Sequence, residues 1–150
     1  MAMVVYIDGA SRGNPGKSGA GIVLLNVSSP VGKNAAVPII SLREYLGIAT
    51  NNEAEYMALI IALRYLKSAV NTDGKLPLEI AFFSDSQLLV RQMNGAYSVK
   101  STNILPLYKK SKKLLEDIKA DSAKFTHIPR ELNKEADKLA NLAIDEATHK

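Results

Sequence analysis

The sequence predicts a single α/β domain with a five-stranded mixed sheet and helices on both faces of the sheet. The first observation is the order of its apolar patterns, β-β-β-α-β-α-α-β-α, because consecutive strands followed by strand and helix alternation are typical of a mixed sheet. The second is size: 150 residues, 47% of them hydrophobic, are enough for one domain with one core. Since no repeat or linker composition divides the chain, we expect residues 1–150 to form one domain.

The first three elements are predicted to be strands. Residues 3–7 are β-branched and aromatic and stop at Asp8 and Gly9, which predicts a buried strand that ends in a carboxylate. Residues 19–25 and 38–48 have the character of two further strands, and the polar, small residues between them predict a long hairpin loop. Three strands in direct succession favour antiparallel pairing.

A long helix and a second strand that ends in an acid follow. Asn51 or Asn52 can cap the helix, in which apolar residues recur at helical spacing and Glu55 faces the packed side of the first turn. Residues 78–83 then predict a strand that runs into Asp85, and either Asp85 or the serine after it can cap the next helix. The pattern of the first strand therefore recurs.

The last third of the chain predicts two helices with a short strand between them. Residues 105–118 form an amphipathic pattern with lysines on the outer face, and residues 124–128 read as a strand. Residues 133–144 predict the final helix, with Asp137 one turn into it. Strand ends and helix starts of such a sheet converge at one edge, where ligands usually bind.

Composition excludes several classes of function. The chain has no cysteine, which excludes disulfides, a thiolate nucleophile and every cysteine-based zinc site. No apolar run approaches the roughly 20 residues that span a bilayer, and an acid comes too early for a secretory signal, so we expect a cytoplasmic protein without a membrane partner. Nineteen Lys and Arg against fifteen Asp and Glu give a net charge of +4, which is compatible with a polyanionic partner.

Four acidic residues stand out because they fall at the predicted edge of the sheet: Asp8, Glu55, Asp85 and Asp137. Each one alone is typical of a helix cap or a surface charge. Together, four carboxylates facing one edge need compensation, since burying a charge costs several kcal/mol unless it is paired. Oxygen ligands without cysteine or a histidine pair favour Mg²⁺ or Mn²⁺ over zinc, and several carboxylates together can hold two ions.

The segments around these acids resemble the four motifs of type 1 ribonuclease H in order and spacing. They are DGASRGNPG at residues 8–16, TNNEAE at 50–55, SDSQ at 84–87 and NKEADKLA at 133–140. The resemblance covers nearly the whole chain. It implies the ribonuclease H-like fold and an endoribonuclease that hydrolyses the RNA strand of RNA/DNA hybrids, leaving 5′-phosphate and 3′-hydroxyl ends.

The resemblance also implies roles for individual residues. Asp8, Glu55, Asp85 and Asp137 match the metal-binding and catalytic carboxylates of the family, which hold two Mg²⁺ ions, with Mn²⁺ as a substitute, in a two-metal-ion mechanism. Other motif residues match positions that contact the hybrid: Ser11, Asn14, Thr50, Asn51, Asn52, Ser86 and Gln87. Helix capping is an alternative role for the two adjacent asparagines, and it is compatible with substrate contact.

The sequence departs from the family in two places. Many members carry a catalytic histidine in the loop before the last helix, where this chain offers His127 at a predicted strand end and Arg130 in the loop after it. We favour Arg130, which can bind phosphate but cannot act as a general base near neutral pH; a plain strand residue and an exposed charge remain the alternatives. The chain has no tryptophan and only a short connection at residues 94–103, so it resembles the short form without the basic protrusion.

Three hypotheses remain open. The first is a monomeric, metal-dependent ribonuclease H with an RNA/DNA hybrid as its partner. The second is a related nuclease that acts also or instead on double-stranded RNA, whose minor groove resembles that of a hybrid. The third is an inactive nucleic-acid-binding module, which the four intact acids argue against. Four lysines at positions 109, 110, 112 and 113 could contact the polyanion or form a solvated helix face.

Overall fold

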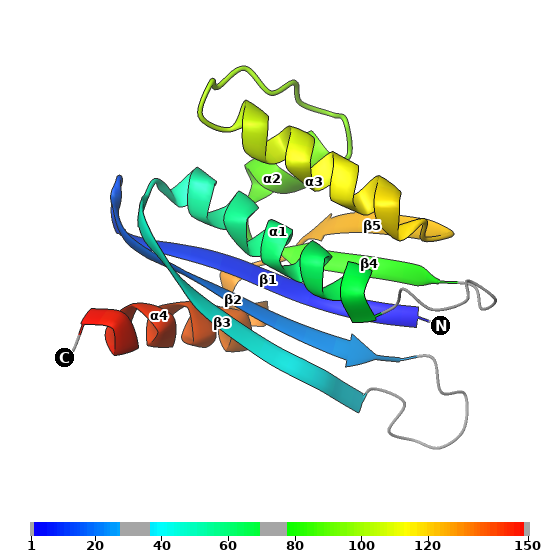
Figure 1. Cartoon of the computed structure of the whole chain (residues 1–150), viewed down its shortest axis with the longest axis horizontal. Coiled ribbons are helices and arrows are strands. Elements are labelled where there is room, and N and C mark those ends of the chain that lie inside the picture. The colour runs from blue at the N-terminus through cyan, green and yellow to red at the C-terminus, as the bar shows by residue number, and fades with distance from the viewer. Residues whose placement is uncertain (1, 28–36, 70–77, 149–150) are drawn as a thin grey trace.

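The computed structural model describes residues 2–27, 37–69 and 78–148 (Figure 1). Its five strands form one sheet in the order β3-β2-β1-β4-β5. The antiparallel pairs are β1–β2 and β2–β3, and the parallel pairs are β1–β4 and β4–β5, which confirms the predicted mixed sheet. The strands are β1 (Ala2–Gly13), β2 (Gly16–Asn26), β3 (Val37–Ala49), β4 (Glu79–Ser84) and β5 (Ser122–His127).

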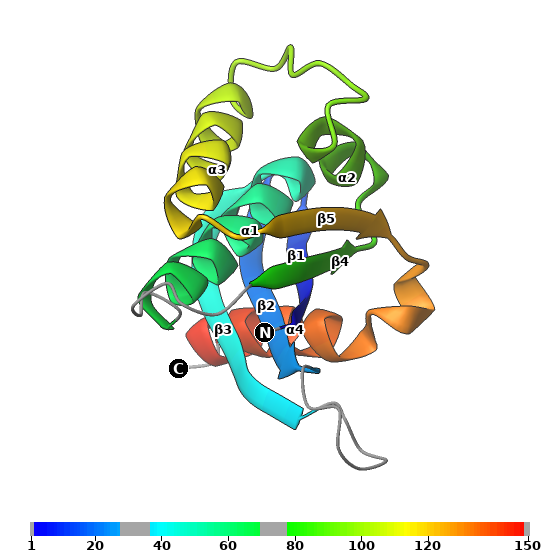
Figure 2. The same cartoon turned by 90° about the vertical axis from the view of Figure 1, so that its right-hand side faces the viewer.

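Helices cover both faces of the sheet, as the sequence predicts (Figures 1 and 2). On one face α1 packs against β1 and β2, with α3 alongside it, whereas α4 packs against β1, β2 and β3 from the other face. Among the described residues, no helix is long and apolar enough to cross a membrane. The helices are α1 (Asn51–Ala69), α2 (Gln87–Met93), α3 (Leu105–Ile118), the short 3₁₀ helix η1 (Arg130–Leu132) and α4 (Lys134–Thr148).

The core lies between the sheet and α1. Alternate residues of β1, Val5 and Ile7, are fully buried, and Leu59 and Leu63 cover them from α1 at helical spacing. Burying one such side chain contributes roughly 1.5–3 kcal/mol relative to leaving it exposed. The strands and the helix that carry the candidate site residues are therefore held by a continuous apolar core.

The first strand is longer than the sequence predicts. Pairing of β1 with β4 ends at Ile7, opposite Ser84, but pairing with β2 continues to Gly13. The expected strand end at Asp8 is therefore wrong: because β2 still supplies a partner, the glycine-rich segment after Asp8 stays extended. Asp8 is nevertheless the first residue of β1 beyond its pairing with β4, which places it at the edge where β4 stops.

The start of α1 is capped by Thr50. The Thr50 hydroxyl accepts a hydrogen bond from the Glu53 backbone N–H at 3.1 Å, and the Glu53 carboxylate accepts one from the Thr50 N–H at 2.8 Å. This reciprocal pair is a capping box, so the expectation that Asn51 or Asn52 caps the helix is wrong. Ser86 caps α2 by accepting from the Leu89 N–H at 3.2 Å, one of the two caps predicted there.

Other element boundaries differ from the prediction by a few residues. The final helix continues to Thr148, beyond the predicted end at residue 144, and β5 begins at Ser122 rather than at residue 124. The predicted hairpin loop before β3 lies largely outside the described residues. These shifts leave the order of elements unchanged.

The last helix rests directly on the backbone of β2. A Cβ atom at Gly21 would lie 2.0 Å from the carbonyl oxygen of Ala136, and one at Gly19 would lie 2.3 Å from that of Ala140. No side chain fits between the strand and α4 at either position. Glycine is thus required here for close approach of the backbones.

Gly21→Ala is expected to lower the free energy of unfolding by about 1–3 kcal/mol, because the added methyl group overpacks the contact with α4. In a domain of this size each kcal/mol corresponds to a fall in Tm of about 2–4 °C, measurable by differential scanning calorimetry. Lys138→Ala, on the exposed face of the same helix, is the control and should change stability by less than about 0.5 kcal/mol. An unchanged Tm for Gly21→Ala would contradict the close packing.

Candidate metal centre

Three acidic side chains from different elements meet at the edge of the sheet. Asp8 lies in β1, Asp85 directly follows β4, and Glu55 lies at the start of the second turn of α1. Each offers a carboxylate oxygen, and these oxygens lie within 4.8 Å of one another. The sheet register explains part of this, because the paired residues Ile7 and Ser84 immediately precede the two aspartates.

Glu55 is oriented by the residue that follows Asp8. The Gly9 backbone N–H donates a hydrogen bond of 2.9 Å to Glu55 Oε1. A Cβ at Gly9 would lie 2.2 Å from the backbone carbon of Ala54, so only glycine lets the first turn of α1 lie this close to β1. The glycine of the first motif therefore serves the position of the second acid.

The fourth predicted acid, Asp137, adjoins the cluster through Asp8. It lies in the first turn of α4, and its carboxyl group is near enough to that of Asp8 to contribute to the raised pKa of Asp8. Asn141, one turn further along the helix, donates to the Asp137 backbone oxygen at 3.0 Å. The structure thus brings three of the predicted acids together around one point and places Asp137 next to one of them.

Burial and mutual repulsion make these carboxylates costly to ionise. Asp8 is 4% exposed, and burial, followed by the charges of Glu55 and Asp85, raises its pKa to about 9. Burial likewise raises the pKa of Glu55 to about 8, with a further contribution from Asp85, while the Gly9 N–H opposes the shift. Burial also raises the pKa of Asp85, against the opposing charge of Arg130. The cluster therefore requires protons or cations near neutral pH.

The donor set fits a hard divalent cation. All the candidate ligand atoms are carboxylate oxygens, which such ions prefer, and a bound cation would offset the repulsion between neighbouring charges. The residues that could hold it are Asp8, Glu55 and Asp85, with Asp137 beside Asp8.

Arg130 and His127 occupy different positions relative to the acids. The Arg130 Nε lies 3.9 Å from Asp85 Oδ2, and its side chain is 84% exposed, so the guanidinium can reach a ligand in solvent. It belongs to η1 rather than to the loop that the sequence predicts, a single 3₁₀ turn that sequence periodicity cannot reveal. His127 is exposed and ends β5, paired with Ser84.

The tip of the β1–β2 hairpin is fastened to the start of α1. Asn14 Oδ1 accepts a hydrogen bond of 3.0 Å from the Asn51 N–H, and Ser11 Oγ donates to the Ala49 carbonyl at 2.8 Å. Asn51 and Asn52 are exposed at the first turn of the helix. Residues from the first two motifs therefore form one surface beside Glu55.

The third motif has local hydrogen bonds of its own. With its amide oriented to satisfy both groups, the Gln87 oxygen accepts from Arg91 Nε at 3.2 Å and from a terminal guanidinium nitrogen of Arg91 at 2.9 Å. The Ser86 hydroxyl accepts from Leu89 and keeps its own proton to donate, so capping and substrate contact are compatible there. The Thr50 hydroxyl, which accepts from Glu53 at the start of α1, likewise keeps its own proton to donate.

Two buried polar contacts near the acids have no clear signal in the sequence. The Tyr56 hydroxyl donates to Gln92 Oε1 at 2.7 Å and links α1 to α2. Asn133, which is 2% exposed, donates from Nδ2 to the Ile7 carbonyl at 2.8 Å. The sequence includes Asn133 in the predicted last helix and gives no sign of a bond to β1.

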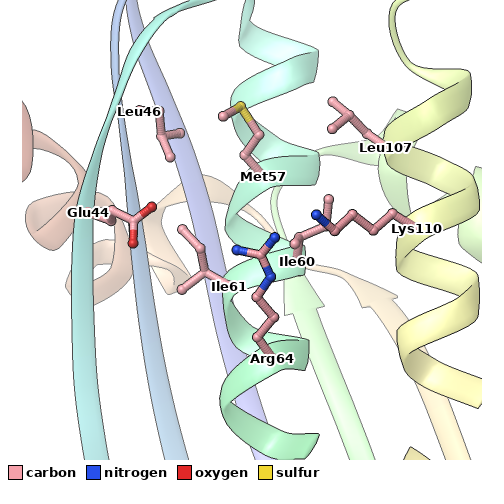
Figure 3. A pocket seen from close by; sticks show the side chains of 8 residues that line it. All are labelled: Glu44, Leu46, Met57, Ile60, Ile61, Arg64, Leu107 and Lys110. Carbon is pink, nitrogen blue, oxygen red and sulfur yellow. The ribbon is translucent and has the colours of Figure 1, made fainter. Parts of the chain in front are cut away.

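A pocket of about 130 Å³ lies apart from the acid cluster, between β3, α1 and α3 (Figure 3). Its lining includes none of the four predicted acids. The rim carries charges of both signs, which favours no single class of ligand. The pocket is lined by Glu44, Leu46, Met57, Ile60, Ile61, Arg64, Leu107 and Lys110.

The chain is similar in sequence to known proteins. A family model described as "Reverse transcriptase-like" matches residues 6–143. The chain is 34% identical to the Ribonuclease H of Chlorobium phaeobacteroides, over 95% of this chain and 94% of that protein. It is 37% identical to the Ribonuclease HI of Halobacterium salinarum over 95% of its own length. The chain spans 64% of the length of the Halobacterium protein and 36% of the length of the mycobacterial proteins that it also resembles.

A solved structure has the same fold. The crystal structure of LC11-RNase H1 in complex with an RNA/DNA hybrid matches with a TM-score of 0.81 and 38% identity, over 97% of this chain and 98% of that one. The agreement covers the sheet, the helices on both faces and nearly the full length of the chain. By sequence and by fold, the chain belongs to the type 1 ribonuclease H family.

Proposed function

We propose that the chain is a metal-dependent endoribonuclease that hydrolyses the RNA strand of RNA/DNA hybrids to 5′-phosphate and 3′-hydroxyl products. The observation that carries the proposal is the cluster of Asp8, Glu55 and Asp85, whose carboxylate oxygens lie within 4.8 Å of one another. The likeness to LC11-RNase H1, which was solved in complex with a hybrid, supports the substrate. Residues 1–150 then form a single catalytic domain, which we propose acts as a monomer.

The proposed cofactor is Mg²⁺, with Mn²⁺ as a substitute, and two ions in the presence of substrate. Asp8, Glu55, Asp85 and Asp137 would hold them. When bound, such ions supply Lewis-acid chemistry, neutralising the scissile phosphate and lowering the pKa of water. The all-carboxylate donor set and the costly burial of Asp8 support this choice over a softer metal.

Protein groups around the acids have distinct proposed roles. The Gly9 N–H fixes one oxygen of Glu55, which keeps that carboxylate directed at the cluster. Arg130 is proposed to bind a phosphate oxygen, because its exposed guanidinium lies next to Asp85 and remains charged at any working pH. This assigns charge stabilisation to Arg130. His127, exposed at the end of β5, is the alternative residue for proton transfer.

The surface made by the hairpin and α1 is proposed to recognise the hybrid. Asn14, Asn51 and Gln87 would contact sugar edges and bases in the minor groove, where the 2′-hydroxyl distinguishes RNA from DNA. Thr50 and Asn52 would line the DNA strand. The bond between Asn14 and the Asn51 backbone N–H supports this role, because it holds the Asn14 side chain beside the start of α1 before substrate binds. Ser11 and Ser86 complete the proposed contacts.

Cleavage of labelled RNA/DNA hybrid, duplex RNA and duplex DNA of one sequence, with Mg²⁺, tests the proposal. We expect cutting of the RNA strand of the hybrid. Asp85→Asn should reduce the cleavage rate by more than about 100-fold, which is more than the loss of a residue that only contacts a metal ligand usually causes. Asp117→Asn is the matched control, since this partly exposed aspartate pairs with Lys67 and Lys113 away from the cluster. Undiminished cutting by Asp85→Asn would contradict the assignment, and faster cutting of duplex RNA would favour the related nuclease.

A further inference from the structure

Asn133 joins the first strand to the last helix beside the acid cluster. Its Nδ2 donates to the Ile7 carbonyl at 2.8 Å, and its backbone carbonyl accepts from the Asp137 N–H at 3.1 Å. The side chain is 2% exposed. One residue therefore holds both the backbone that precedes Asp8 and the backbone of Asp137.

These two hydrogen bonds close a small ring of contacts. Ile7 is the last residue of β1 that pairs with β4, and Asp8 follows it directly. The Asp8 carboxyl group interacts in turn with that of Asp137. Asn133 thus restrains the separation between the two acids through the backbone next to Asp8 and the backbone of Asp137.

The orientation of the amide is not that of an ordinary helix cap. An asparagine before a helix usually accepts, through Oδ1, from a backbone N–H in the first turn. In the described part of the chain, Asn133 Oδ1 is buried without a hydrogen-bond partner. A buried polar atom without a partner carries a desolvation cost. The amide is therefore oriented for the bond to Ile7 and not for a helix cap.

We propose that Asn133 is a positioning residue that sets the spacing between Asp137 and Asp8 and thereby the affinity of the acid cluster for Mg²⁺. It acts through Asp137 and touches neither substrate nor metal. This inference rests on the proposed function, since it requires that the acids bind Mg²⁺. It differs from a purely structural role because removing Asn133 should matter only while Asp137 is present.

Calorimetric titration of MgCl₂ into the protein, in a double-mutant cycle, tests this dependence. Asn133→Ser introduces a residue that is favoured at helix N-caps but is too short to reach Ile7. We expect it to raise the Mg²⁺ dissociation constant by about 10-fold or more, within the range for outer partners of metal sites. In an Asp137→Asn background, the same change should alter the constant less than about twofold. The KM for hybrid at saturating Mg²⁺ should stay within about twofold of the wild-type value.

The control is Ala140→Gly, which weakens the same helix through its lower helix propensity and leaves Asn133 in place. It should leave the Mg²⁺ dissociation constant unchanged, at a temperature where circular dichroism shows every variant folded. Suppose that wild type binds Mg²⁺ but Asn133→Ser binds it equally well, or that the substitution lowers Mg²⁺ affinity by the same factor with and without Asp137. Either result overturns this inference and leaves the proposed function standing. If the wild-type protein neither binds Mg²⁺ nor cuts hybrid, both the inference and the proposed function are overturned.

Discussion

Asp8→Asn is expected to abolish cleavage of the hybrid and, in the same protein, to raise the Tm of the metal-free state. Asp8 is central to the cluster, because burial and the charges of Glu55, Asp85 and Asp137 all act on it. An amide in its place removes one of the carboxylates proposed to hold the metal. The loss of activity should exceed about 100-fold, and excess Mn²⁺ should not restore it.

The gain in stability follows from like-charge repulsion. When both are ionised, two carboxylates less than 4.8 Å apart repel each other by about 3–4 kcal/mol at an effective dielectric constant of 20. Asparagine is nearly isosteric and uncharged, so it avoids both this repulsion and the cost of burying the charge. The gain should grow with pH up to about 9, the value to which the pKa of Asp8 is raised.

Differential scanning calorimetry in EDTA at about pH 8 measures this gain, where each kcal/mol corresponds to about 2–4 °C. Asp117→Asn should instead lower the Tm, because that partly exposed aspartate is paired with two lysines that lower its pKa. A lower Tm for Asp8→Asn than for wild type, in EDTA, would show that the Asp8 carboxylate does not destabilise the metal-free protein.

The stability of the metal-free protein is expected to fall between about pH 4 and about pH 9, with a corresponding rise in its response to Mg²⁺. The pKa of Asp8 is raised from 3.8 to about 9 and that of Glu55 from 4.5 to about 8. Between these limits the folded state binds more protons than the unfolded state, so the free energy of unfolding decreases as pH rises. Above about pH 9 the contribution of these two groups levels off.

Mg²⁺ reverses this trend because it competes with protons for the same oxygens. Its affinity should rise by up to about tenfold per pH unit for each proton released. At a Mg²⁺ concentration 100 times the dissociation constant, the stabilisation is about 2.7 kcal/mol. Thermal melts with and without one fixed MgCl₂ concentration, at about pH 6 and about pH 8.5, should therefore show the larger shift at the higher pH. Equal shifts at both values, or a shift retained in Asp85→Asn, would contradict the linkage.

The fold was largely predictable because its elements have strong local periodicity. The α1 pattern and the buried strand at Val5 and Ile7 are set by side chains that the sequence displays directly. The extension of β1 to Gly13 was not predictable, since its glycines lack β propensity and the pairing depends on β2. The cap at Thr50 depends on Glu53 three residues away, so the asparagines alone gave the wrong cap.

The acid cluster was predictable because two of its acids directly follow the apolar runs that pair as β1 and β4. The sequence places Asp8 and Asp85 after two buried strands, and parallel pairing of those strands brings them together with Glu55. The contact between Asn133 and Ile7 was not predictable, since the two residues are far apart in the chain and meet only when α4 docks on the sheet. The roles assigned to the individual site residues stay predictions until the variants are measured.

Glu55 arrives from the helix on one side of the sheet and Asp137 from the helix on the other (Figure 1). The ions proposed to bind Asp8, Glu55, Asp85 and Asp137 would therefore link the two helices on opposite faces of the sheet. Detachment of either α1 or α4 from the sheet would then require release of a bound ion. Amide hydrogen exchange in α1 and α4 should consequently slow in concert when Mg²⁺ is added, although the two helices lie on opposite faces.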